Sequence, residues 1–178
     1  MFLRHLAPIV IGDYPFADEL KKDIVPLLEK YPDQMNKTTN VKATHTEWNW
    51  GLKEESGIQI KKFGKYILNE IQKQVGINLK GVGEEPPPLI MTNFWANVYE
   101  KGDHAISHHH DPYKFSFAYF VKSKWYHSPL IFTESGKRIR PKEGRFVAFP
   151  SYLKHHVPKH RYGDSRVTLS GNLTINRR

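Results

Sequence analysis

The stretch SRVTLSGNLTI, residues 165–175, predicts a β-strand whose two faces differ in character. Side chains alternate between the faces of a strand, so every second residue shares a face. The polar face carries Arg166, Thr168, Ser170, Asn172 and Thr174. The apolar face carries Val167, Leu169, Leu173 and Ile175. A polar row that begins with an arginine does not suit the core of a plain sandwich. It suits the lining of a polar pocket inside a barrel.

Other short runs after residue 88 are β-branched or aromatic and are separated by polar turns, which predicts an all-β second half. They are residues 89–99, 115–121, 129–133 and 144–150. In the first of them Trp95, Asn97 and Tyr99 share one face.

The first half shows helical periodicity instead. Residues 16–31 place Leu20, Ile24, Leu27, Leu28 and Tyr31 on one stripe, with a predicted kink at Pro26. Residues 57–76 place Ile60, Phe63, Ile67, Ile71 and Val75 on another, and Gly76 is predicted to end that helix. Helices that precede a β half usually cover one face of its sheet.

Composition narrows the chemistry. The 178 residues are 39% hydrophobic and 25% charged, which is typical of one soluble domain. The chain has no cysteine, so disulfides, thiolate metal sites and cysteine nucleophiles are excluded, and His, Asp or Glu must hold any metal. No signal peptide and no run of 18 apolar residues is found. We therefore expect a cytoplasmic protein with no membrane partner.

The positive charge lies in the second half. Residues 1–100 contain 12 Lys and Arg against 13 Asp and Glu, whereas residues 101–178 contain 15 against 5, which gives the net charge of +9. Eight of the ten histidines also lie there. A basic face suits nucleic acid, an acidic protein or a small dianionic substrate.

The stretch SHHHD, residues 107–111, offers two pairs of metal ligands. Ligands two residues apart on an extended segment point the same way, so either His109 pairs with Asp111 or His108 pairs with His110. His-x-Asp is part of the 2-His-1-carboxylate face of a non-haem Fe(II) site, whereas the other pair would leave a site with histidines only.

A third ligand is available in FPSYLKHHVPKH, residues 149–160. His155 suits this role, and His156 alternates to the other side. Arg166 follows eleven residues later and could bind a carboxylate through both arms of its guanidinium, or pair with Asp164 instead. We expect His104, His127 and His160 at the surface. We expect Trp48 and Trp50 to serve core or lid packing.

The order of these residues resembles the Fe(II)/2-oxoglutarate-dependent oxygenases, and among them the prolyl 4-hydroxylases most. The resemblance covers roughly residues 93–175. Tyr99, ten residues before His109, is similar to the tyrosine that prolyl hydroxylases place on the co-substrate. EGRFVAFPSYLKHHV, residues 143–157, is similar to the strand and turn that carry their distal histidine. Prolyl hydroxylases often carry a second tyrosine where this chain has Phe120.

The resemblance implies a mainly β fold with N-terminal helices, namely a double-stranded β-helix (a cupin-like jelly roll) with the helices packed on the major sheet. It implies one domain over residues 1–178. Within it, residues 1–88 form a helical support region with the first strands, and residues 89–178 form the catalytic jelly-roll core.

The resemblance also implies a site. His109, Asp111 and His155 would hold Fe(II), and 2-oxoglutarate would bind the metal as co-substrate. Arg166 would bind its far carboxylate, and Tyr99 and Asn97 would hold it from the opposite strand: the cofactor-binding set is Arg166, Tyr99 and Asn97. The enzyme would be a dioxygenase that hydroxylates a substrate C–H bond with release of succinate and CO₂.

Three functions follow from these patterns. We favour a prolyl-hydroxylase-like enzyme that acts on a protein or peptide. A nucleic-acid demethylase of the same superfamily is the second, although residues 167–176 lack the further arginine that such enzymes carry. The third is a cupin that binds metal and a small ligand through His108, His110 and His155. Gly102 and Pro150 match the cupin motifs, but residues 114–116 lack the usual glutamate.

Overall fold

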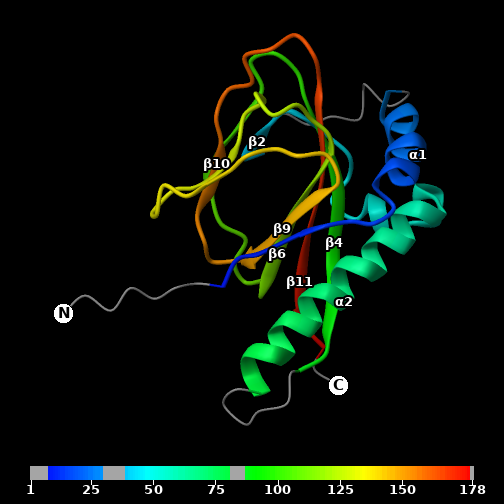
Figure 1. Ribbon diagram of the computed structural model, residues 1–178, viewed down its shortest axis with the longest axis vertical. Helices are drawn as coiled ribbons and strands as arrows, with labels where there is room; N and C mark the ends of the chain where they lie inside the picture. Colours follow the sequence, from blue (N-terminus) through cyan, green and yellow to red (C-terminus); the bar gives the residue numbers. More distant parts are fainter. Residues whose placement is uncertain (1–7, 30–38, 81–86, 177–178) are drawn as a thin grey trace.

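A computed structural model describes residues 8–29, 39–80 and 87–176, which form two antiparallel sheets and two helices (Figure 1). The larger sheet has the strand order β1-β9-β6-β11-β4-β3. Its strands are β1 (Val10–Asp13), β9 (Arg145–Pro150), β6 (Phe115–Lys122), β11 (Arg166–Ile175), β4 (Leu89–Tyr99) and β3 (Thr44–His45).

The smaller sheet has the order β2-β5-β10-β7-β8. Its strands are β2 (Val41–Lys42), β5 (His104–His108), β10 (His155–Val157), β7 (Leu130–Phe132) and β8 (Arg138–Ile139). The two sheets face each other as in a jelly roll. The mainly β, jelly-roll prediction with N-terminal helices is confirmed.

Two helices cover the outer face of the larger sheet. They are α1 (Ala17–Glu29) and α2 (Ile58–Lys80), and two short 3₁₀ helices, Trp50–Leu52 and Glu54–Ser56, precede α2. Figure 1 shows α2 crossing β4 obliquely. Helix α1 continues past Pro26. The predicted end at Gly76 is wrong, because α2 continues to Lys80 and Gly76 does not adopt a positive φ.

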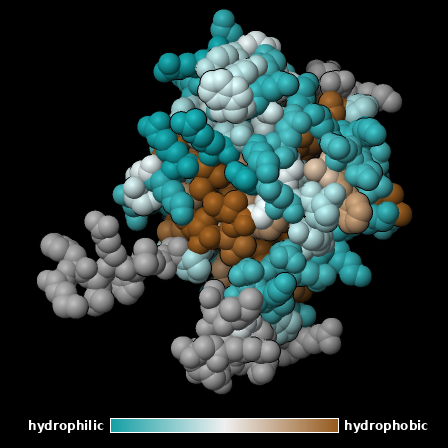
Figure 2. All heavy atoms as spheres, in the orientation of Figure 1, coloured by the Kyte–Doolittle hydropathy of each residue, from teal (hydrophilic) through white to brown (hydrophobic). Residues whose placement is uncertain are grey.

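The apolar residues form two cores, one on each side of the larger sheet. The outer core joins the helices to the sheet through the predicted stripes: Leu20, Ile24, Leu28, Ile60, Phe63, Ile67 and Ile71. Trp50 is part of this core, whereas Tyr31 of the predicted stripe lies outside the described residues. The second core includes Phe120, Phe132, Val147, Phe149 and Val157 and draws on strands of both sheets. Figure 2 shows a mostly hydrophilic face with a hydrophobic area over the strands.

Strand β11 is central to the larger sheet, where it pairs with β4 and β6. Val167, Leu169 and Leu173 belong to the core on the helical side. Arg166, Thr168 and Ser170 line a cavity between the sheets. The predicted division of this strand into an apolar and a polar face is therefore confirmed.

We expect Gly171→Ala to destabilise the fold by about 2–3 kcal/mol, because the position is already filled. A Cβ atom there would lie 2.5 Å from Cε1 of Phe117 and 2.6 Å from the backbone oxygen of Asn93. Urea unfolding of the two proteins measures the difference. Gly163→Ala is the matched control, because nothing lies within 4 Å of its Cβ position, and its effect should stay within about 0.5 kcal/mol. An equally small effect at Gly171 would contradict the packing described here.

Candidate metal centre and its cavity

Three histidines from two neighbouring strands converge at one end of the space between the sheets. His108 ends β5 and His155 begins β10, and the two residues are directly paired in register. His110 lies two residues beyond His108, so its side chain returns to the same side. One ring nitrogen of each of the three histidines lies within 4.8 Å of the other two. The ring centroids are 4.5–5.1 Å apart.

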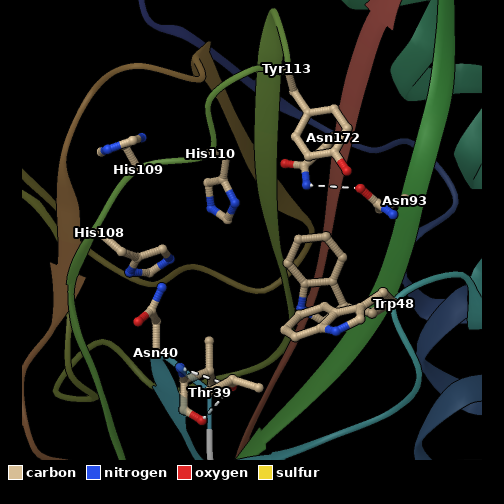
Figure 3. A pocket seen from close by; sticks show the side chains of 11 residues that line it. Thr39, Asn40, Trp48, Asn93, His108, His109, His110, Tyr113 and Asn172 are labelled. Atoms are coloured by element: carbon tan, nitrogen blue, oxygen red, sulfur yellow. Dashed lines mark hydrogen bonds between the residues drawn. The ribbon is translucent and has the colours of Figure 1, made fainter.

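The segment that follows β5 sets which side chains face inward. The backbone N–H of His110 donates to the backbone oxygen of Ser151 at 2.8 Å, which ties this segment to the turn before β10. Figure 3 shows the rings of His108 and His110 turned toward the centre of the pocket, whereas the ring of His109, which also borders the pocket, points away from them.

His109 and Asp111 are about half exposed, and Nδ1 of His109 lies 3.4 Å from Oδ2 of Asp111. Among the described residues, two groups of three potential ligands have donor atoms within 4.8 Å of one another, and neither group contains His109 or Asp111. The structure therefore brings His155 together with His108 and His110, the alternative pair in the sequence, and not with His109 and Asp111.

Backbone hydrogen bonds fix the tautomer of two of these rings. Nδ1–H of His108 donates to the oxygen of Ile106 at 2.7 Å, and Nδ1–H of His155 donates to the oxygen of Leu153 at 2.9 Å. Each ring is left with a lone pair on Nε2. Metal-binding histidines commonly donate their second ring nitrogen to a carbonyl in this way, which orients the ring and raises its basicity as a ligand.

Burial keeps the three imidazoles neutral. It lowers the pKa of His108, and it lowers the pKa of His110 and of His155 to about 3, with the neighbouring histidines adding to the shift. At neutral pH a metal ion therefore meets three unprotonated nitrogen ligands. Three imidazoles suit Fe, Zn, Cu or Ni, so the donor set fits a divalent transition metal.

Arg166 lies in the same cavity as the three histidines. It is 2% exposed, and its Nε and Nη1 atoms have no hydrogen-bond partner among the described residues. Its guanidinium lies over the rings of Tyr99 and Phe120, 4.8 and 5.2 Å from their centroids. Burial lowers the pKa of Arg166 to about 10, so the group stays charged at neutral pH.

Asp164 does not neutralise Arg166. Its carboxylate accepts hydrogen bonds from Tyr126 and from His127 instead. None of the residues that line the cavity is Asp or Glu. A buried charge without a partner is costly, so this cavity calls for an anion that none of the described residues supplies.

The other predicted co-substrate residues lie on β4, opposite β11. Asn97 donates through Nδ2 to the hydroxyls of Thr168 and Ser170 at 3.3 Å and accepts from Nε1 of Trp95 at 3.1 Å. Tyr99 pairs with Arg166 in register and is buried, which raises its pKa. The structure thus brings Tyr99, Asn97 and Arg166 together in the cavity that also holds His155.

An open pocket adjoins the histidine cluster (Figure 3). Aromatic and amide side chains line it, and His108 and His110 form part of its wall: the others include Trp48, Trp95, Tyr113, Asn40, Asn93 and Asn172. Trp48 is 41% exposed and stacks on His45, so it borders the pocket and is not part of the core. No Lys, Arg, Asp or Glu is among the lining residues in the part of the chain that the structure describes.

The second group of potential ligands is His127, His160 and Asp164. The expectation that His127 and His160 lie at the surface is wrong, because they are 3% and 1% exposed. Both histidines lie in loops, where the sequence has no helix or strand periodicity from which burial could be predicted. The spacing of His160 and Asp164 was the only sequence signal for this cluster.

No helix among the described residues is long and apolar enough to span a bilayer.

Comparison with known proteins connects the chain to one fold. No protein-family model and no curated protein matches the sequence. Among solved structures, a Pseudomonas putida prolyl-4-hydroxylase matches with a TM-score of 0.70 at 14% identity, over 96% of this chain and 94% of that one. A viral collagen prolyl hydroxylase from Paramecium Bursaria Chlorella virus-1, in complex with 2OG, matches with a TM-score of 0.63 at 12% identity, over 93% and 94%.

AviO1 from Streptomyces viridochromogenes Tue57 matches with a TM-score of 0.65 at 11% identity, over 96% of this chain and 90% of that one. The chain therefore has the prolyl 4-hydroxylase fold over nearly its whole length, and the fold expected from the sequence resemblance is confirmed.

Proposed function

We propose that the protein is a metal- and 2-oxoglutarate-dependent dioxygenase whose metal is held by His108, His110 and His155. One observation carries the proposal, namely that the three histidines and the unpaired Arg166 line the same cavity. We propose this set in place of His109, Asp111 and His155, which are the ligands expected from the sequence. Bound Fe(II) with 2-oxoglutarate would supply the oxidising chemistry, with succinate and CO₂ as products.

The chain's own residues would bind and orient the co-substrate. Arg166 offers a guanidinium fork to the far carboxylate, which would satisfy its Nε and Nη1 atoms. Tyr99 and Phe120 hold that guanidinium in place through their ring faces. Thr168 and Ser170 offer hydroxyls on the same wall, positioned by Asn97. The surrounding apolar side chains of the second core would exclude water from this end.

We propose a protein or peptide substrate, bound in the pocket between Trp48 and Tyr113. The pocket presents aromatic rings and neutral amides, which suit an uncharged peptide segment. The named activities of two structural neighbours, prolyl hydroxylases, make a proline-containing peptide the first substrate to test. Nucleic acid is the less favoured alternative, because none of the described residues that line the pocket offers a Lys or Arg to a phosphate group.

The test is succinate production from 2-oxoglutarate by the Fe(II)-loaded protein, with a proline-containing peptide or a methylated oligonucleotide as substrate. We expect the peptide to stimulate succinate release and the oligonucleotide to have no effect. His155→Asn should lower the rate at least about 100-fold, because asparagine can keep the bond to the oxygen of Leu153 but has no atom at the Nε2 position.

His156→Asn is the matched control for this assay. His156 neighbours His155 but contacts Thr133 and lies outside the cluster, so the rate should be unchanged. Equal loss in the two variants, or no succinate with any substrate, would count against the proposed reaction.

A further inference from the structure

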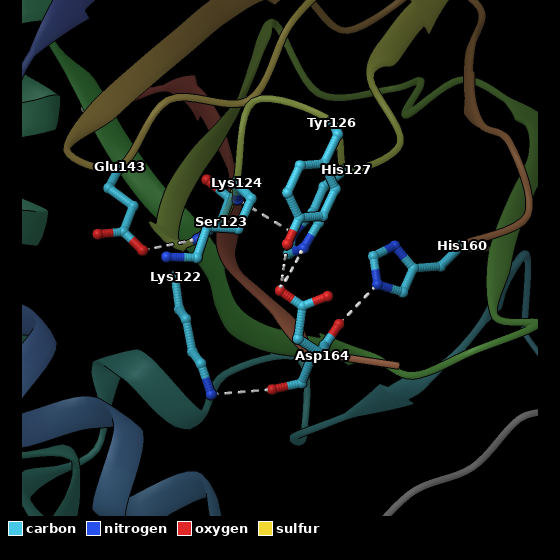
Figure 4. Close-up of polar contacts among 9 residues, drawn as sticks. Lys122, Ser123, Lys124, Tyr126, His127, Glu143, His160 and Asp164 are labelled. Carbon is cyan, nitrogen blue, oxygen red and sulfur yellow. Dashed lines mark hydrogen bonds and ion pairs between the residues drawn. The ribbon is translucent and has the colours of Figure 1, made fainter. Parts of the chain in front are cut away.

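A second cluster of metal-ligand side chains lies in two loops that the proposed reaction does not use. His127 comes from the loop after β6, and His160 and Asp164 come from the loop between β10 and β11 (Figure 4). One ring nitrogen of each histidine and a carboxylate oxygen of Asp164 lie within 4.8 Å of one another. None of the three residues is among those that line the cavity of the first cluster.

The tautomer of His127 leaves its Nε2 atom directed at the carboxylate. The backbone N–H of Lys124 donates to Nδ1 of His127 at 3.2 Å, so the ring proton is on Nε2. That proton is shared with Oδ2 of Asp164 at 3.0 Å. A metal ion at Nε2 would take the place of this proton and gain an oxygen of Asp164 as a neighbouring ligand, and the ring proton would then have to lie on Nδ1, in place of the bond from the Lys124 N–H.

His160 brings a buried ring nitrogen that nothing satisfies. Its Nε2–H donates to the backbone oxygen of Asp164 at 2.7 Å. Its Nδ1 atom is inaccessible to solvent and has no hydrogen-bond partner among the described residues, on a side chain that is 1% exposed. Buried polar atoms in native structures are normally paired, so this unpaired nitrogen, on a ring that belongs to the cluster, indicates a missing partner.

We propose that His127, His160 and Asp164 form a second metal site, which takes a divalent transition ion of the zinc type. Two imidazoles and one carboxylate match the ligand preference of zinc. Ligands at 2.0–2.1 Å from a tetrahedral ion lie about 3.3 Å apart, so the donor atoms have to close by at most about 1.5 Å. Water would fill the remaining position, because the Asp164 side chain is 41% exposed.

The position of the cluster would let the ion join two loops. The ion would cross-link the loop after β6 to the loop before β11. Its ligand Asp164 lies two residues before Arg166 in the sequence. The hydroxyl of Tyr126 already donates to Oδ2 of Asp164 at 3.1 Å and would orient that ligand. The site does not depend on the proposed reaction, because the two clusters share no residue.

The experiment counts zinc ions on chelator-treated protein by equilibrium dialysis and elemental analysis. The wild type should bind two ions per chain, and His160→Gln and His155→Asn should bind one each. Glutamine can retain the bond to the oxygen of Asp164 while removing the Nδ1 lone pair. His104→Gln changes a histidine outside both clusters and should still bind two.

Thermal unfolding gives a second measurement in the His155→Asn background, where the second cluster alone remains intact. Zinc at about 100 times its Kd should raise the Tm by about 5–10 °C. The shift should vanish when His160→Gln or Asp164→Asn is added, while the metal-free Tm of the double variants shows that they still fold.

The second site would be overturned if the His155→Asn protein bound no zinc. It would also be overturned if His155→Asn still bound zinc after His160→Gln or Asp164→Asn was added. If the wild type binds a single ion, and this ion is lost in His160→Gln but kept in His155→Asn, the result would support this site and overturn the three-histidine centre.

Discussion

Arg166→Met is expected to lower the affinity for 2-oxoglutarate at least about 100-fold while leaving the unliganded protein as stable as the wild type or more stable. The two effects have one cause. The guanidinium is buried, two of its nitrogens have no hydrogen-bond partner among the described residues, and methionine fills similar space without a charge. Replacing buried charges with apolar side chains is often neutral or stabilising by about 1–4 kcal/mol. The lost fork of charge-assisted hydrogen bonds accounts for the lost affinity.

Calorimetry with Mn²⁺-loaded protein measures the first effect, and urea unfolding of the metal-free protein measures the second. Arg138→Met removes the same charge from an exposed position and should change neither quantity. Arg166→Lys should recover only part of the affinity, because an ammonium cannot form the planar fork. Unchanged 2-oxoglutarate affinity in Arg166→Met would remove Arg166 from the co-substrate site. A large loss of stability would mean that the fold itself satisfies the charge.

The sequence was sufficient to predict the environment of Arg166, because the relevant pattern is local. In an antiparallel strand the period of two decides which side chains share a face, and residues 166–175 carry a clear polar and apolar row. The same rule placed Asn97 and Tyr99 on the cavity side of β4. The helical stripes of Leu20 and Phe63 followed from the period of 3.6 in the same way.

Features that depend on distant contacts were not accessible to the same reasoning. Gly76 is a typical helix stop, but α2 continues to Lys80, so the local preference of one residue does not set the end of this helix. His127 and His160 are buried because loops from different parts of the chain meet at Asp164.

The candidate metal ligands show most clearly which features a local pattern cannot decide. In SHHHD a shift of one residue exchanges His108 and His110 for His109 and Asp111, and both pairs obey the period of two. The choice is made by the pairing of His108 with His155 and by the bond from the His110 N–H to the oxygen of Ser151. Both contacts join residues more than 40 positions apart, so no local pattern reports them.

This choice of register gives the last prediction. His110→Ala should weaken Mn²⁺ binding at least about 100-fold, because it removes one of three ligands from the centre. Asp111→Ala should leave Mn²⁺ affinity within about threefold of the wild type, since its carboxylate is half exposed and contacts His109 rather than the cluster. His109→Ala should behave like Asp111→Ala. Calorimetric titration of the metal-free proteins compares all three variants.

His110→Asp sharpens the same test, because it places a carboxylate at the inward position and creates a 2-His-1-carboxylate centre with His108 and His155. We expect this variant to bind Mn²⁺ at least as tightly as the wild type, since a charged oxygen ligand replaces a neutral nitrogen for a metal that favours oxygen. If Asp111→Ala abolishes binding and His110→Ala does not, His109 and Asp111 are the ligands after all. The chain after β5 would then have to rotate by one residue when the metal binds, which requires breaking the bond between His110 and Ser151.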